Sequence, residues 1–119
     1  MLVQIGPRLP EWLRKPWRDA ASDHEVKRLM RSKSLHTVCE SARCPNRNEC
    51  FSRGTATFMI GGNICTRHCA FCSVPAGKPD DYEAIAGEPD QVADAAAQLR
   101  LEYVVVTAVA RDDLADGGA

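Results

Sequence analysis

Six cysteines divide into two groups of three, and their spacing constrains the fold of this chain more than any other feature. The first triad is Cys39-x4-Cys44-x5-Cys50, and the second triad is Cys65-x3-Cys69-x2-Cys72. Each triad is one thiolate short of the four that usually hold an iron–sulfur cluster. A cluster held by three thiolates leaves one iron open to a substrate or cofactor, much as a catalytic zinc keeps an open position. The spacing therefore predicts two metal centres with different tasks.

Disulfides and zinc are the alternatives to iron–sulfur clusters. The start of the chain lacks the basic stretch and apolar core of a secretion signal, and no apolar run approaches the roughly 18 residues of a membrane span. We therefore expect a cytoplasmic protein with reduced cysteines, in which metal binding is favoured over the fifteen disulfide pairings that six cysteines allow. Zinc sites usually contain Cys-x2-Cys pairs and a fourth ligand, which here could only be His68 or a distant cysteine.

The second half of the chain alternates between strand and helix patterns. Residues 55–60 form a β-prone run that ends at Gly61-Gly62, and residues 103–109 form a mostly β-branched run, typical of a parallel strand covered on both faces. A helix is expected between them from about Asp90, with one face made of Val92, Ala96 and Leu99. This pattern predicts an α/β fold with one βαβ unit and the second triad in the loop after its first strand. A chain of 119 residues is about half of a usual (β/α) barrel, so a complete barrel is excluded.

The first half of the chain is less regular. Residues 1–21 contain three prolines and both tryptophans, which favours an extended arm lying on another surface. Ser22-Asp23-His24-Glu25 matches a capping box, so we expect a short amphipathic helix to about Lys33 with Val26, Leu29 and Met30 on its apolar face. The first triad then follows in a stretch that we expect to be irregular. The three histidines are interpreted as solvated or structural: His24, His36 and His68.

Charge is distributed unevenly along the chain. Residues 1–53 carry a net charge of +5 and residues 54–119 a net charge of −6, whereas the whole chain has −1. A net charge near zero gives no general attraction to nucleic acid. The basic half could instead steer an acidic protein partner, although solvated helix and loop faces explain the same charges. The residues of this hypothesis are Arg14, Lys15, Arg18, Lys27, Arg28, Arg31 and Lys33.

The second triad resembles the cluster loop of the radical S-adenosylmethionine superfamily. That loop has the pattern Cys-x3-Cys-x-aromatic-Cys, and the chain has Cys65-Thr66-Arg67-His68-Cys69-Ala70-Phe71-Cys72. The resemblance implies that Cys65, Cys69 and Cys72 hold a 4Fe–4S cluster and, with Phe71, form the cofactor site. It also implies that S-adenosylmethionine binds the open iron and is cleaved by one electron to a 5′-deoxyadenosyl radical. The implied fold is the N-terminal portion of a partial (β/α) barrel.

The first triad resembles the auxiliary-cluster motif of the lipoyl synthase family. The similarity covers residues 37–46 and Glu49-Cys50, and it continues through residues 10–13, 54–60 and 111–119. It implies a sulfurtransferase that inserts sulfur at C6 and C8 of an octanoyl chain carried on a lysine. Cys39, Cys44 and Cys50 would hold the auxiliary 4Fe–4S cluster, whose sulfides are the sulfur source. The implied partners are an octanoylated lipoyl-carrier domain and an electron donor such as ferredoxin or flavodoxin.

The chain also departs from the family pattern. It contains no Arg-Ser-Ser-Tyr motif, whose serine closes the auxiliary cluster in the family, and it has Ala108 and Ala110 where the family has serine and aspartate. Gly117-Gly118 resembles the superfamily's cofactor-binding glycine pair but precedes Ala119 instead of an acid, and a plain loop terminus is the alternative interpretation. We therefore expect a truncated synthase, inactive alone, with the arm, helix and auxiliary motif in residues 1–53 and the start of the radical core in 54–119. The alternative is a non-catalytic iron–sulfur electron carrier or remnant, although such carriers generally have four-cysteine sets.

Overall fold

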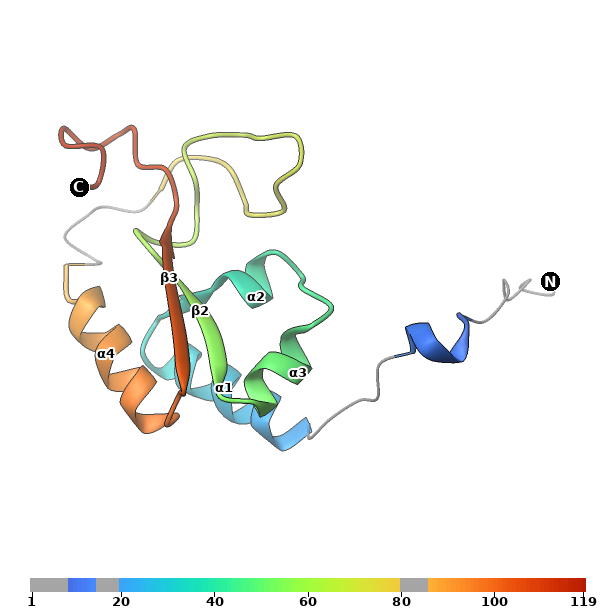
Figure 1. The fold of residues 1–119 in the computed structure, drawn as a ribbon. Coiled ribbons are helices and arrows are strands. Elements are labelled where there is room, and N and C mark those ends of the chain that lie inside the picture. The colour runs from blue at the N-terminus through green and yellow to red at the C-terminus, as the bar shows by residue number, and fades with distance from the viewer. Residues whose placement is uncertain (1–8, 15–19, 80–85) are drawn as a thin grey trace, which may run out of the picture.

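The computed structural model describes residues 9–14, 20–79 and 86–119 (Figure 1). The elements in chain order are the 3₁₀ helix η1 (Glu11–Leu13), α1 (Ala20–Ser32), β1 (His36–Thr37), α2 (Val38–Ser41), α3 (Arg47–Ser52), β2 (Thr55–Ile60), α4 (Glu88–Gln98) and β3 (Tyr103–Ala108). No helix in these ranges is long and apolar enough to cross a membrane. The predicted α/β class is confirmed.

The described strands form one sheet in the order β1-β2-β3. Strand β1 pairs antiparallel with β2, and β2 pairs parallel with β3 from Thr55 opposite Tyr103 to Ile60 opposite Ala108. Helix α4 connects the two parallel strands, so the predicted βαβ unit is confirmed. Figure 1 shows α4 on one side of these strands and α2 and α3 on the other. The carboxyl ends of β2 and β3 meet at one edge of the sheet, where α/β folds usually bind ligands.

The core joins α1 and α4 to β2. Its fully buried centre is Phe58, and the apolar face predicted for the first helix is confirmed because Val26 and Met30 are buried and Leu29 packs against them. Helix α1 begins at Ala20, two residues before the predicted cap Ser22. The Asp23 carboxylate, within the predicted capping box, accepts a hydrogen bond from Arg47 of α3. Helix α4 begins at Glu88, with Pro89 in its first turn, where a missing N–H is tolerated.

Strands β2 and β3 differ in burial. Ala56 and Phe58 of β2 are completely buried, whereas every residue of β3 is exposed. The prediction that residues 103–109 form a strand covered on both faces is therefore wrong for residues 103–108. The physical reason is position, since β3 lies at the edge of the sheet and the core helices pack on β2.

The prediction of an irregular segment around the first triad is wrong for residues 38–41 and 47–52, which are helical, and is confirmed for residues 42–46. Cys39 lies on α2 and Cys50 on α3, with Cys44 between the two helices. In the N-terminal arm, Glu11–Leu13 forms a 3₁₀ turn on which Trp12 is 81% exposed. The rest of the predicted arm, residues 1–8 and 15–19, lies outside the described residues, as do residues 80–85 of the loop before α4.

Candidate metal centres

The first triad begins on a helix with a defined start and end. The Thr37 hydroxyl accepts a hydrogen bond from the Glu40 amide at 3.2 Å and caps α2. After the helix, Arg43 adopts a left-handed conformation with φ 51°, and its amide bonds to the Glu40 carbonyl. The Cys44 amide then bonds to the Cys39 carbonyl at 3.0 Å. These two bonds form a Schellman motif, which turns the chain back and brings Cys44 next to Cys39.

Helix α3 carries Cys50 and is anchored to α1 by a buried carboxylate. Asp23, which is 3% exposed, receives the Arg47 guanidinium at 2.8 Å and the Lys27 ammonium at 2.6 Å. Burial opposes ionisation of Asp23, but the hydrogen bonds from Lys27 and Arg47 outweigh it and hold the pKa of Asp23 below its ordinary value. Phe51, the residue after Cys50, packs into the core. The position of Cys50 is therefore set by the packing of the fold.

The three thiols of the first triad are half-buried neighbours. All six cysteines of the chain are free, and those at 39, 44 and 50 are each partly covered. Burial raises the pKa of Cys39, and the charges of Cys44 and Cys50 raise it further. Since metal ligands must be thiolates, a metal that binds here has to displace a proton from Cys39.

The second triad lies in the loop after β2, as predicted. Gly61 and Gly62 have φ angles of 84° and 94°, which turn the chain out of the strand. The Cys65 amide bonds to the Pro75 carbonyl and the Cys65 carbonyl accepts from the Gly77 amide, both at 2.9 Å, so the loop closes at its base. Cys69 and Cys72 lie exposed at its tip, and Phe71 between them is 92% exposed.

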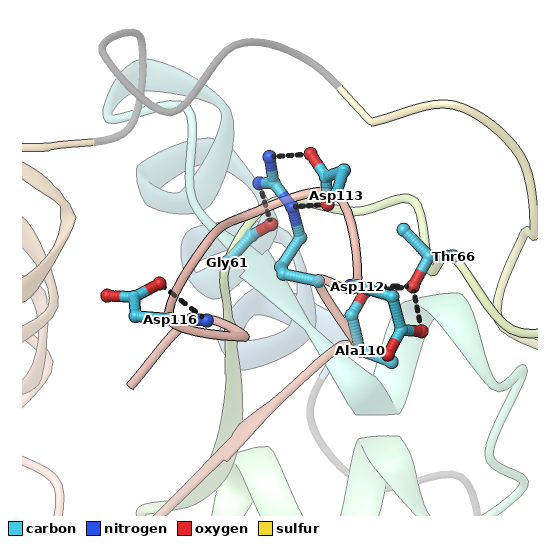
Figure 2. A network of polar contacts seen from close by, with 8 residues as sticks. Gly61, Thr66, Ala110, Asp112, Asp113 and Asp116 are labelled. Carbon is cyan, nitrogen blue, oxygen red and sulfur yellow. Dashed lines mark hydrogen bonds and ion pairs between the residues drawn. The ribbon is translucent and has the colours of Figure 1, made fainter.

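The base of this loop is bonded to the chain that leaves β3. The Thr66 amide donates to the Ala110 carbonyl at 3.1 Å, and the Ala110 amide donates to the Cys65 sulfur at 3.3 Å. Asp112 accepts two bonds from the Arg67 guanidinium, at 3.0 Å each, and one from the Thr66 hydroxyl at 2.7 Å. Figure 2 shows the Thr66 and Asp112 side chains turned toward each other. The bonds from Arg67, followed by the one from Thr66, lower the pKa of Asp112 to about 2.

A cavity of about 190 Å³ opens beside this junction, at the carboxyl ends of β2 and β3. Its wall includes Gly117 and Gly118, the pair that resembles a cofactor-binding turn, and Arg111, which is 3% exposed. The Arg111 guanidinium donates to the Gly61 carbonyl at 2.8 Å, and the Gly61 amide donates to the Glu88 carboxylate at 2.9 Å. Charged side chains therefore hold both backbone groups of Gly61.

Arg111 is further bound by Asp113, with contacts of 3.0 and 2.8 Å in the network of Figure 2. Hydrogen bonds from Arg111 hold the pKa of Asp113 below its ordinary value. Sequence reasoning missed the structural roles of Arg111 and Glu88. The only signal for Arg111 was its place in an Arg-Asp-Asp run directly after a strand, and Glu88 is one of two acids in a helix's first turn.

The chain offers two groups of three free thiols as candidate metal ligands. In the described residues, no three His, Cys, Asp or Glu side chains converge closely enough to hold one metal ion. A cluster with one open iron is held by three thiolates, which is the number in each group. Of the histidines, His24 and His68 are exposed and His36 is half-buried in β1.

The basic residues near the N-terminus are partly engaged within the molecule. Lys27 pairs with Asp23, and Lys33 lies 3.5 Å from the Asp94 carboxylate of α4. Arg28 and Arg31 are exposed, whereas Lys15 and Arg18 lie outside the described residues. Among the described residues of this set, Lys27 and Lys33 are therefore engaged within the molecule, whereas Arg28 and Arg31 are exposed.

Comparison with known proteins yields many similar sequences. No protein-family model matches the chain. A lipoyl synthase of Symbiobacterium thermophilum is 60% identical over 112 residues, which are 94% of this chain and 34% of that protein. One from Chromobacterium violaceum is 54% identical and covers 99% of the chain, and lipoyl synthase 2 of Prochlorococcus marinus is 52% identical and covers all of it. The chain spans 34 to 39% of the length of these three relatives.

Proposed function

The chain belongs to the lipoyl synthase family and matches the N-terminal portion of its members; on that premise, we propose that it supplies the cluster-binding part of a radical sulfurtransferase. Residues 1–53 hold the auxiliary 4Fe–4S cluster through Cys39, Cys44 and Cys50. Residues 54–119 begin a partial (β/α) barrel and hold the radical-generating cluster through Cys65, Cys69 and Cys72. The reaction is sulfur insertion at C6 and C8 of a protein-bound octanoyl group.

The observation that carries this proposal is the position of the second triad. Its cysteines lie in the loop that follows β2, at the carboxyl edge of a parallel strand pair, and the same edge carries the cavity lined by Gly61 and Gly118. Ligands of α/β folds bind at this edge. A non-catalytic electron carrier would need the cysteines but would not need such a cavity.

In this proposal the two cysteine triads have different chemical roles. When bound, the second cluster with S-adenosylmethionine supplies one-electron cleavage of a carbon–sulfur bond, and the auxiliary cluster supplies sulfur. Cys69 and Cys72 are exposed, so their thiolates are accessible to a cluster with an open iron. The Ala110 amide donates to the Cys65 sulfur and fixes the base of the loop, whereas the first triad is kept half-covered by helices α2 and α3.

The partners in this proposal are an octanoylated lipoyl-carrier domain and a one-electron donor such as ferredoxin or flavodoxin. Arg28 and Arg31 on α1 are exposed, and we propose that they contribute to the contact with an acidic partner. Because the chain spans about a third of its relatives, we expect no turnover by residues 1–119 alone.

The decisive experiment replaces the matching segment of the Symbiobacterium enzyme with residues 1–119. After anaerobic reconstitution with iron and sulfide, the chimaera should convert an octanoylated carrier to the lipoylated form and release 5′-deoxyadenosine. The matched control carries Cys65→Ala, which should abolish release of 5′-deoxyadenosine. A chimaera that holds both clusters but does not cleave S-adenosylmethionine would favour the electron-carrier alternative.

A further inference from the structure

Asp112 is exposed but forms several hydrogen bonds with Thr66 and Arg67. Its carboxylate accepts a two-pronged bond from Arg67 and a short bond from the Thr66 hydroxyl, and its own amide donates to the Thr66 oxygen at 3.1 Å. Thr66 and Arg67 directly follow Cys65, and they precede Cys69 in the same loop. The segment that follows β3 therefore contacts the first part of the second triad's loop, although Asp112 is 46 positions from Thr66 and 45 from Arg67 in the sequence.

These contacts contribute little to the overall fold. Asp112 and Arg67 have side chains that are 52% and 67% exposed, and ion pairs of this kind usually add little to stability because water screens them. Their geometry is nevertheless specific, because a guanidinium fork meets both oxygens of one carboxylate only in a narrow range of orientations. The arrangement therefore restricts the orientation of the loop more than it stabilises the fold.

The Thr66 hydroxyl has one proton and two acceptors. The Ala110 carbonyl lies at 3.0 Å and the Asp112 carboxylate at 2.7 Å, so the shorter, charge-assisted bond to Asp112 is favoured. The Ala110 carbonyl keeps its bond from the Thr66 amide, and the neighbouring Ala110 amide donates to the Cys65 sulfur. Asp112 therefore restricts the conformation of residues 65–67, and this segment sets the direction of the Cys65 thiol.

We propose that Asp112 is a positioning residue for the second triad: through Thr66 and Arg67 it fixes the direction of the Cys65 thiol and holds the Arg67 guanidinium against the segment that follows β3. The cluster-related part of this inference rests on the proposed function. A cationic group and an N–H···S bond near a cluster thiolate both affect how firmly the cluster is held and its reduction potential.

The test uses Asp112→Asn in the 119-residue chain, with Asp94→Asn on α4 as a control that removes the same charge from an exposed carboxylate outside this loop. In the metal-free protein, the amides of Thr66 and Asp112 should exchange with deuterium faster in Asp112→Asn than in the wild type or Asp94→Asn. The unfolding midpoint should hardly move. Asp112→Glu keeps the carboxylate and should restore part of the protection, which a mere change in net charge would not do.

The same variants are then reconstituted in a background in which the first triad is replaced by alanine, so that only the second cluster is observed. Asp112→Asn should lose iron to a chelator roughly two- to fivefold faster than Asp94→Asn, the range expected for an exposed charged pair. Its electron paramagnetic resonance spectrum in the reduced state should also change.

Equal exchange rates and equal iron loss in the two asparagine variants would overturn the role of Asp112. If the wild-type second triad binds no cluster, the proposed function fails, but the exchange measurement still decides whether Asp112 orders the loop. The two ideas can therefore fail separately.

Discussion

The two cysteine triads are supported in different ways. The first triad lies on and between two short helices, and the second of these is anchored to α1 by the buried Asp23 and to the core by Phe51. The second triad lies on an exposed loop that is fixed at its base by backbone bonds and by Asp112. One site depends on the packed core, whereas the other depends on a local set of polar contacts. In the proposed function, the exposed Cys69 and Cys72 leave the open iron of the second cluster accessible to S-adenosylmethionine.

The largest expected effect is on stability and concerns two phenylalanines, each next to the last cysteine of one triad. Phe51 follows Cys50 and is 5% exposed, whereas Phe71 precedes Cys72 and is 92% exposed. Phe51→Ala should lower the free energy of unfolding by about 3–5 kcal/mol, because it leaves a cavity in the core. Phe71→Ala should change it by less than about 0.5 kcal/mol. Urea unfolding followed by circular dichroism measures both, and equal losses would contradict the division between core and loop.

A smaller effect concerns the anchor of the first triad. Asp23→Asn should lower the free energy of unfolding by roughly 1.5 kcal/mol at neutral pH, since a charged hydrogen-bond acceptor is lost. Because the pKa of Asp23 is lowered in the folded state, its contribution is fully present above the ordinary value of about 3.9 and disappears as the pH falls through the folded value.

The matching measurement is a series of unfolding curves from pH 6 down to pH 2.5. The wild type should lose its advantage over Asp23→Asn below about pH 4. A constant difference between the two proteins across this range would show that ionisation of Asp23 does not stabilise the contact between α1 and α3.

The smallest expected effect tests the turn that brings Cys44 back to Cys39. Arg43 has a φ of 51° and Arg100, after α4, has a φ of 50°, and neither residue is glycine. Replacing either by glycine should raise the free energy of unfolding by roughly 0.5–1 kcal/mol, because the steric cost of the left-handed conformation exceeds the entropy cost of glycine. Arg100→Gly is the matched control outside the triads. A loss of stability in Arg43→Gly alone would indicate that the Arg43 side chain has a structural role of its own.

Much of the fold could be predicted from local patterns. The bounds of β2 were predicted correctly because its β-prone residues end abruptly at Gly61-Gly62, and α1 was found from the spacing of Val26, Leu29 and Met30. The same residue types predicted the strand at 103–109 but not its exposure, since burial depends on what packs over a strand. Helix α2 was missed because a four-residue helix has no periodicity, although Thr37-x-x-Glu40 is a capping signal.

The candidate sites were predictable only in part. Spacing indicates the six cysteines as candidate cluster ligands, because ligands of one cluster recur close together in sequence, and this assignment stays a prediction. The supporting contacts could not be found in this way, since Arg67 and Asp112 are 45 positions apart and nothing local marks them as partners. The left-handed Arg43 gave no signal either, because glycine is the usual residue at such a turn.

In the proposed function each triad holds its own cluster, the first at three half-buried thiols and the second at a loop whose Cys69 and Cys72 are exposed. The most direct test is the iron and sulfide content of three reconstituted chains: the wild type, one with alanine at 39, 44 and 50, and one with alanine at 65, 69 and 72. We expect roughly eight irons in the wild type and about four in each variant, because each 4Fe–4S cluster contains four. The cluster of the second triad should be lost to a chelator first. A wild type that binds about four irons or fewer, or one that keeps eight when a triad is removed, would contradict this assignment.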